Sequence, residues 1–208
     1  MYVFKERKPP KYACKKDIAI IPNGKHFEIG VSDTFHLGNM YKHIHDLLQS
    51  MGYFDPDTNN ENFENLYLQR TQQNGLMFHH IWWRAVKNLD NGNGDKFQAF
   101  LRLNFQTVAV SQHETMIDGK KFKTFKGDVT IRIKAYLRID PKNQWDKHLI
   151  IKYFQKIMLD RWLAKQIGQC KNEVYGDLLE LQRQIKHYMG GKVGLPSDKQ
   201  WNEGITGI

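Results

Sequence analysis

Residues 97–139 read FQAFLRLNFQTVAVSQHETMIDGKKFKTFKGDVTIRIKAYLRI, and this stretch decides the fold. Apolar and polar residues alternate over Val129–Ile139, and the same alternation runs more loosely over Phe97–Phe105. A period of two is typical of a β-strand with one buried and one solvated face. Asp118-Gly119 lies between the two arms and is the dipeptide that a type I′ turn prefers. The stretch therefore predicts one long antiparallel β-hairpin.

The register of this hairpin predicts a β-bulge. A two-residue loop at Asp118-Gly119 pairs residues so that Phe105 falls opposite Arg132, and apolar side chains would meet charged ones along the ladder. One extra residue in the second arm repairs the match. The repaired pairs are Phe105 with Ile133, Leu103 with Ala135, and Leu101 with Leu137. We place the bulge at Gly127, because glycine tolerates a positive φ; the alternative is a second turn at Lys126-Gly127 that divides the ribbon into two shorter hairpins.

Length and charge bound the class of protein. The 208-residue chain can form one domain with a sizeable core, and it carries a net charge of +9 from 31 basic and 22 acidic residues. This excess favours a polyanionic partner or an acidic protein surface, with a merely solubilising surface as the alternative. Cys14 and Cys170 lack the paired spacing of a disulfide framework or a zinc site. Without a signal peptide or a run of roughly 18 apolar residues, we expect a soluble intracellular chain with no membrane span.

The chain divides into a basic N-terminal arm (1–17), a single α+β domain (18–190) and a C-terminal tail (191–208). The elements expected before the hairpin are short strands over 17–21 and 26–31, a helix that ends near residue 51, and a strand over 76–86. Ser32, Asp33 or Thr34 is the expected N-cap of this helix, whose apolar residues recur every three or four positions.

Two C-terminal helices are predicted to help cover the apolar face of the sheet. The first runs from about Gln144 to Lys165, and the second from a cap at Asn172 to about Met189. The apolar side of the first helix consists of Leu149, Ile150, Tyr153, Phe154, Ile157, Met158 and Trp162. That of the second consists of Val174, Leu178, Leu181, Ile185 and Tyr188. The predicted fold class is therefore α+β, with an antiparallel sheet built on the long bulged hairpin (97–139) and covered by one N-terminal and two C-terminal helices.

Motifs for catalysis or metal binding do not stand out in this sequence. No stretch matches the zinc-protease, P-loop, dinucleotide-binding or serine-hydrolase patterns. His43 and His45 lie two apart on a predicted helix, and His79 and His80 alternate on a predicted strand, so the members of each pair point apart. We therefore assign no catalytic residue, no metal ligand and no cofactor, and expect a protein that is not an enzyme.

The solvated face of the hairpin carries the clearest binding signal. Its basic residues are Arg102, Arg132, Lys134 and Arg138, with Tyr136 among them. A basic β-surface of this kind can follow a phosphate backbone. The alternative is that exposed strand faces carry Lys and Arg to avoid pairing with other chains.

The two terminal segments predict a second kind of surface. They are rich in lysine, proline and glycine, yet they hold four large side chains that a purely solvated tail has little use for: Tyr2, Phe4, Tyr12 and Trp201. We predict that these four aromatic residues dock on other subunits.

Several short motifs resemble a group of small uncharacterised proteins of archaeal and phage genomes. They are Gly52-Tyr53, Ile81-Trp82-Trp83, Gly119-Lys120-Lys121, Lys126-Gly127-Asp128, Tyr136-Leu137-Arg138-Ile139-Asp140 and Trp145. The resemblance covers roughly residues 35–190 and implies no established activity. The predicted order of helix, antiparallel sheet and helices also resembles the tail-completion and neck proteins of tailed phages, although a fold does not determine a function.

Two classes of function are consistent with these features. The first is a non-enzymatic structural subunit of a virion, in a phage tail, neck or baseplate, assembled in the host cytoplasm with copies of itself and other structural subunits as partners. The second is a cytoplasmic nucleic-acid-associated or ribosome-associated binding protein that uses the basic hairpin face. Salt dependence separates them, because a protein that follows phosphates loses affinity steeply as salt rises.

Overall fold

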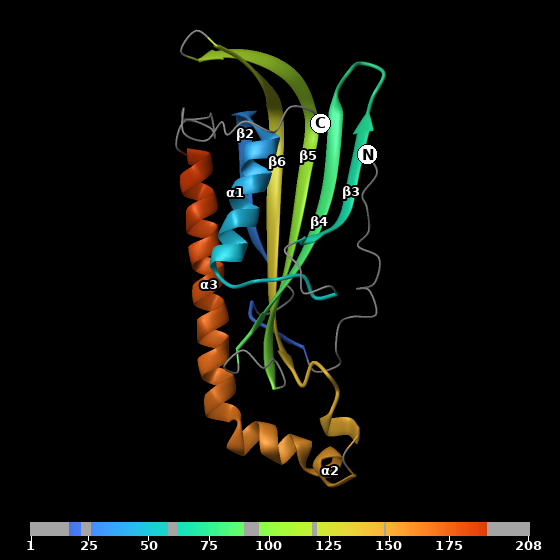
Figure 1. The fold of residues 1–208 in the computed structure, drawn as a ribbon, viewed down its shortest axis with the longest axis vertical. Coiled ribbons are helices and arrows are strands. Elements are labelled where there is room, and N and C mark those ends of the chain that lie inside the picture. The colour runs from blue at the N-terminus through green and yellow to red at the C-terminus, as the bar shows by residue number, and fades with distance from the viewer. Residues whose placement is uncertain are drawn as a thin grey trace.

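The computed structural model describes residues 17–21, 26–57, 62–89, 96–117, 120–147 and 149–190. It confirms the α+β class: a six-stranded antiparallel sheet with helices contributed by both ends of the chain (Figure 1). The strands are β1 Ile18–Ala19, β2 Phe27–Phe35, β3 Glu64–Thr71, β4 Met77–Asn88, β5 Phe97–Ile117 and β6 Lys120–Ile139. The helices are α1 Leu37–Ser50, α2 Leu149–Ile157 and α3 Ala164–Gly190, with a 3₁₀ turn at Trp145–Lys147 and a π-helical turn at Met158–Trp162.

The sheet is a meander with its first strands folded back onto its last. From one edge the order is β3, β4, β5, β6, and β6 also pairs with β1 and with β2. The predicted strands before the hairpin are present, although the second extends to Phe35. Strand β3 was not predicted, because its sequence ENLYLQRT does not alternate cleanly between apolar and polar residues.

The hairpin β5–β6 contains the predicted bulge, but on the other arm. The two loop residues lie outside the described part, and Ile117 pairs with Lys120 on either side of them as expected. The register shifts between Val108 and Ser111, so two residues of β5 face Gly127 of β6. The pairs formed are Phe105 with Ile131, Leu103 with Ile133, and Leu101 with Ala135. Placing the extra residue at Gly127 was therefore wrong, and the hairpin continues past the bulge as one ribbon rather than two.

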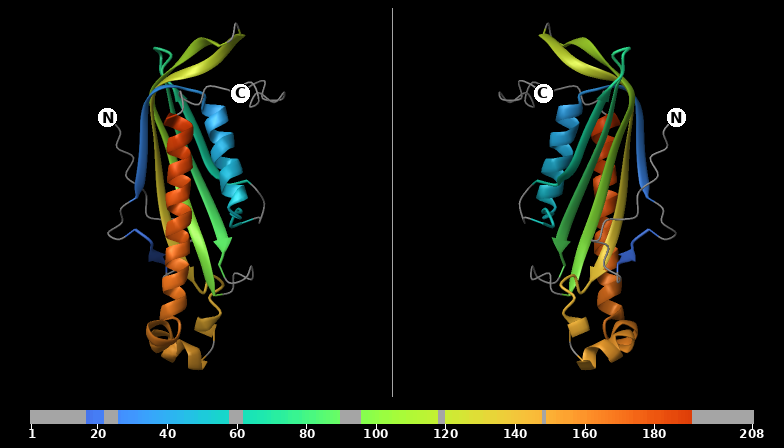
Figure 2. Two further views of the ribbon diagram at one scale, coloured as in Figure 1. Left: turned by 90° about the vertical axis from the view of Figure 1, so that its left-hand side faces the viewer. Right: turned by 90° about the vertical axis from the view of Figure 1, so that its right-hand side faces the viewer.

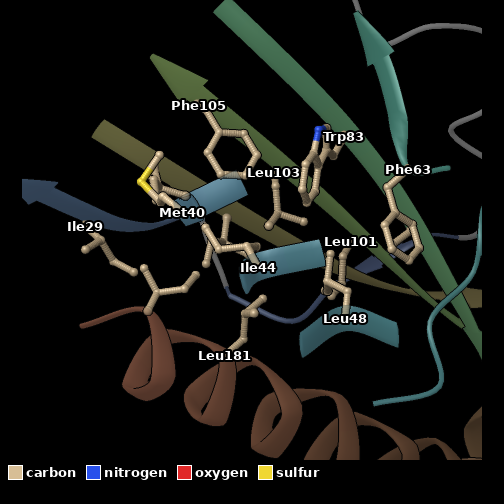
Figure 3. Packing of buried hydrophobic residues seen from close by; sticks show 14 of the residues in the cluster. Ile29, Met40, Ile44, Leu48, Phe63, Trp83, Leu101, Leu103, Phe105 and Leu181 are labelled. Carbon is tan, nitrogen blue, oxygen red and sulfur yellow. The ribbon is translucent and has the colours of Figure 1, made fainter. Parts of the chain in front are cut away.

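The core fills the space between one face of the sheet and the helices α1 and α3 (Figure 2). Ile44 and Leu48 of α1 meet Leu101 and Leu103 of β5, and Leu181 approaches from α3 (Figure 3). Each of these side chains is at most 1% exposed, so this layer supplies the main apolar burial of the domain.

Helix α1 begins later than predicted. Ser32, Asp33 and Thr34 belong to β2, so none of them is the N-cap. His36 takes this role, and its Nδ1 accepts a hydrogen bond from the N–H of Asn39 at 3.0 Å. The helix keeps the predicted apolar stripe, because sheet contact rather than the cap residue selects which face is buried.

The two C-terminal helices differ most from the prediction. The expected first helix is interrupted at the π-helical turn, and α3 begins at Ala164, so Asn172 lies inside a helix rather than at its cap. The predicted apolar seam of the second helix is confirmed, since Val174, Leu178, Leu181 and Ile185 are fully buried. Helix α3 runs along the sheet, whereas α2 lies beyond the end of the sheet and does not cover it (Figure 1).

Candidate functional site

Four residues predicted to dock on other subunits, Tyr2, Phe4, Tyr12 and Trp201, lie outside the described residues. Their role stays a prediction. The four basic residues predicted to bind a polyanion all lie on β5 and β6, and the register places Arg102 directly opposite Lys134.

Arg138 does not belong to an open binding face. Its side chain is buried, with 7% of the residue exposed, and its guanidinium lies 3.6 Å from the centre of the Phe100 ring. Its Nε is 3.7 Å from the Asp17 carboxylate, so its charge has an acidic neighbour. Alternation along β6 predicted the correct face of the sheet for Arg138, but it did not predict that the Arg138 side chain is buried there.

Arg132 is exposed but already paired. Its Nε donates to Glu28 Oε2 at 2.9 Å across the β2–β6 pair, and its Nη1 donates to Gln106 at 3.1 Å. Hydrogen bonds from Arg132 and then from His26 lower the pKa of the Glu28 carboxyl, which keeps that carboxylate charged. The positive charge of Arg132 is therefore largely neutralised within the sheet.

A row of three cations crosses the middle of this face. Arg84 on β4 pairs with Arg102 on β5, and Arg102 pairs with Lys134 on β6. Arg84 was missed, although it lies in the predicted strand 76–86, because alternation along one strand does not show which residues of the next strand lie opposite. Like charges directly opposite one another destabilise a sheet, so this row calls for compensation.

Aromatic and amide groups supply part of that compensation. The guanidinium of Arg102 lies 5.4 Å from the Phe100 ring centre and 5.7 Å from that of Tyr136. Arg84 Nε donates to the side chain of Asn65 at 2.6 Å. Among the described residues, the buried Nε of Arg102 has no hydrogen-bond partner.

The buried histidine of β4 has a structural environment. His79 is 2% exposed, and Thr107 Oγ1 lies 2.8 Å from its Nδ1 and accepts from its backbone N–H at 2.9 Å. Burial lowers the pKa of its imidazole.

Within the described ranges, no group of three His, Cys, Asp or Glu residues could hold a metal ion. No helix there is both long and apolar enough to cross a membrane.

The most unusual surface lies on α2 and the π-helical turn. Four large side chains are exposed there, and we call them the aromatic face: Tyr153 (78% exposed), Phe154 (57%), Ile157 (50%) and Trp162 (77%). The sequence predicted that these residues would pack on the sheet. That expectation is wrong, because α2 lies past the end of the strands (Figure 1).

The opposite side of this segment is anchored to the body. Leu159 and Leu163 pack on a second apolar cluster that includes Phe97, Ile139 and Ile167. The π-helical turn closes with a hydrogen bond from the N–H of Leu163 to the carbonyl of Met158 at 2.9 Å. Such turns re-aim side chains locally and are frequent at functional sites. The aromatic face is therefore held outward by a packed support.

The segment that carries the aromatic face is rich in positive charge. The segment Lys147–Lys165 contains five Lys or Arg residues against one acidic residue, Asp160. Lys147, Arg161 and Lys165 are exposed in the structure. This segment therefore combines exposed large apolar side chains with exposed basic ones.

No family model matches this sequence, and no curated protein matches it significantly.

Proposed function

We propose that this protein is a non-enzymatic structural subunit of a larger assembly, and that the aromatic face on α2 and the π-helical turn docks on an acidic surface of a neighbouring subunit. The observation that carries the proposal is the exposure of Tyr153 and Trp162, each more than three quarters accessible. Large aromatic residues dominate the binding energy of protein interfaces.

Among the residues that the structure describes, none of the core buries these side chains. Leu159 and Leu163 on the other side of the segment already occupy the contact with the body. A contiguous exposed apolar patch with a polar rim is typical of an interaction site. A partner that covers the patch would gain the hydrophobic contribution that the isolated chain leaves unused.

The charge around the patch selects the partner. A segment rich in lysine and arginine attracts a surface of the opposite sign and repels other basic surfaces. A net charge of +9 acts in the same direction over longer distances. The neighbouring subunit should therefore present carboxylates around an apolar centre.

The narrower form of the proposal is a virion position, in a phage tail, neck or baseplate. It rests on the analogy with tail-completion and neck proteins. The predicted docking of the terminal segments through Tyr2, Phe4, Tyr12 and Trp201 would add further contacts to the same assembly.

The test compares two double variants in the native host. Tyr153→Ser with Trp162→Ser removes the aromatic face, and Tyr175→Ser with Leu179→Ser is the matched control, since both of those α3 residues are exposed by more than 40%. We expect the first variant to lose at least tenfold of its high-mass fraction in sedimentation of a native extract, and the control to keep it. Equal sedimentation of both variants with the wild type would contradict the proposal.

A second candidate function is polyanion binding at the cation row Arg84, Arg102 and Lys134. The observation that favours it is that three like charges are held directly side by side despite their repulsion. Arg102→Ala with Lys134→Ala should weaken binding to single-stranded nucleic acid of any sequence and flatten its salt dependence. Arg132→Ala should have a smaller effect, because Glu28 already neutralises Arg132. Unchanged binding in the double variant would remove this face from consideration.

A further inference from the structure

Strand β3 forms an edge of the described sheet, and its seven residues Asn65–Thr71 are all exposed (Figure 1). Proteins protect edge strands with proline, with charges or with shortness, because an open edge pairs with other chains. After a bulge at its start, β3 contains no proline, and Arg70 is its one charged residue. Leu66, Tyr67 and Leu68 in its middle are 37%, 41% and 44% exposed.

The sequence of this edge is complementary to itself. Read outward from Tyr67 in both directions, ENLYLQR matches Leu66 with Leu68, Asn65 with Gln69, and Glu64 with Arg70. An antiparallel pair of two copies centred on Tyr67 would therefore place leucine opposite leucine and amide opposite amide. Cross-strand pairs of this kind stabilise a sheet.

The backbone of β3 is arranged for the same pairing. The N–H of Gln72 donates to the carbonyl of Leu76 at 2.8 Å, which sets the alternation of the β3–β4 ladder. After the bulge, Leu66, Leu68 and Arg70 therefore bond to β4, and Tyr67, Gln69 and Thr71 turn their N–H and C=O groups to the outer edge. The centre of the self-complementary sequence is thus also a residue with outward backbone groups.

The side chains around the edge support this arrangement. Leu66 pairs with Trp82 of β4, and Leu68 lies on the same face. Trp82 is 40% exposed. A two-fold axis through the edge and perpendicular to the sheet would join this apolar patch to its copy. The bulge turns Glu64 toward α1, where it accepts a hydrogen bond from Tyr41. The self-complementary part of the open edge is therefore Asn65–Gln69, and Glu64 lies outside it.

We propose that two copies of this chain associate through β3, edge to edge and antiparallel about Tyr67, to form one continuous sheet. This interface is separate from the aromatic face and goes beyond the proposed docking to a neighbouring subunit. A symmetric pairing of this type is closed, so it stops at two copies.

The first test measures the mass of the purified chain by light scattering. The wild type should show about twice the chain mass of 24.6 kDa. Leu66→Lys with Leu68→Lys places lysine opposite lysine in both halves of the interface and should give single chains. Leu66→Lys with Leu68→Glu places lysine opposite glutamate and should restore the doubled mass. Both variants should keep the wild-type circular dichroism spectrum, because the two leucines are exposed.

The proposal would be overturned by a wild type of single-chain mass, by a Lys/Lys variant that still associates, or by a Lys/Glu variant that does not. A mass that grows beyond two copies would indicate open head-to-tail pairing and would also overturn it. These outcomes do not depend on incorporation into a larger assembly, so this proposal and the proposed function fail separately.

The second test uses the symmetry axis. In a Cys14→Ser background, Tyr67→Cys should form a covalent dimer under mild oxidation, because directly opposed residues of a hydrogen-bonded pair lie at about 5.5 Å between Cα atoms, within disulfide range. Gln69→Cys is the matched control: it faces Asn65 of the other copy and should stay uncrosslinked. Equal crosslinking of the two variants would contradict a pairing centred on Tyr67.

Discussion

Gly127 lies opposite the bulge of the central hairpin, with φ of +154°. A Cβ added there would lie 2.9 Å from Val110 Cα and 3.1 Å from the Ala109 carbonyl oxygen. Both contacts are with backbone, which cannot move aside as a flexible side chain could. The glycine is therefore required by the close approach of the bulged strand as well as by its own dihedral angle.

We expect Gly127→Val to lower the free energy of unfolding by roughly 1–3 kcal/mol, the scale of a strained backbone position. Urea denaturation would measure the change. Gly30→Val on β2 is the control, because nothing lies within 4 Å of its added Cβ, and its cost should stay within about 0.5 kcal/mol. Equal costs at the two glycines would show that Gly127 is not under steric constraint.

The sequence predicted that a bulge exists but not which strand carries it. Because side chains alternate between the two faces of a strand, the hairpin needs one extra residue to bring its apolar side chains onto one face. An extra residue in either arm meets this need. Glycine at position 127 suggested the second arm, yet Ala109 on the first arm adopts the left-handed conformation with φ of 52°. Gly127 is the residue that the bulged strand approaches, and it is not part of the bulge. Local conformational propensity alone does not distinguish these two roles for a glycine.

One buried and three half-buried histidines make stability depend on pH. Burial lowers the pKa of His36, His43, His79 and His80 below the ordinary value of 6.5. The unfolded chain therefore binds more protons than the folded chain in mildly acidic solution. Their contribution to stability is complete above pH 6.5 and is lost as the pH falls through the lowered folded-state values.

His36 allows this to be tested at one residue. Its Nδ1 accepts the capping hydrogen bond of α1, and a protonated imidazole cannot accept. His36→Asn keeps a capping acceptor without a titrating group, so the free energy of unfolding should fall less steeply between about pH 7 and pH 5. Urea denaturation across this range would measure it. An unchanged slope would show that His36 does not contribute to the pH dependence.

At the scale of elements, α2 and the π-helical turn show that an apolar stripe at helical spacing can be exposed rather than buried. Their apolar spacing resembles that of α1 and α3, and periodicity does not show whether a stripe meets the chain's own core or another molecule. The buried seam of helix α3 was predicted correctly, because the sheet is long enough to cover it, although the helix begins earlier than predicted. The location of α2 was not, because it depends on where β6 ends relative to the 3₁₀ turn.

This difference predicts opposite mutational effects in neighbouring helices. Tyr153→Ser and Trp162→Ser should each change the free energy of unfolding by less than about 0.5 kcal/mol, because the side chains are already in solvent. Leu178→Ala on α3, which is fully buried, should cost roughly 2–5 kcal/mol. Denaturant unfolding of the three variants would decide. A large loss at Tyr153 or Trp162 would place them in the core and contradict the proposed docking surface.

At the scale of the whole molecule, the proposed binding surfaces lie away from the core that fixes the fold. The sequence predicted the class, the central hairpin and the face of the cations correctly, since these follow from alternation along single strands. It did not predict the third cation, Arg84, or the edge strand β3, since both depend on how separate strands are ordered in space. It also did not predict that Arg138 is buried, since this too depends on the packing of a separate segment, which brings Asp17 beside Arg138.

The measurement that tests the central claim most directly is hydroxyl-radical labelling of the aromatic face, read by mass spectrometry. Tyr153 and Trp162 should be labelled in the isolated chain, where they are 78% and 77% exposed, and protected at least fivefold in the complex purified from native cells. Tyr175, on α3, is the internal control and should be labelled equally in both. Equal labelling of Tyr153 and Trp162 in the chain and in the complex would contradict the account, as would a chain that purifies from its cells without any other subunit.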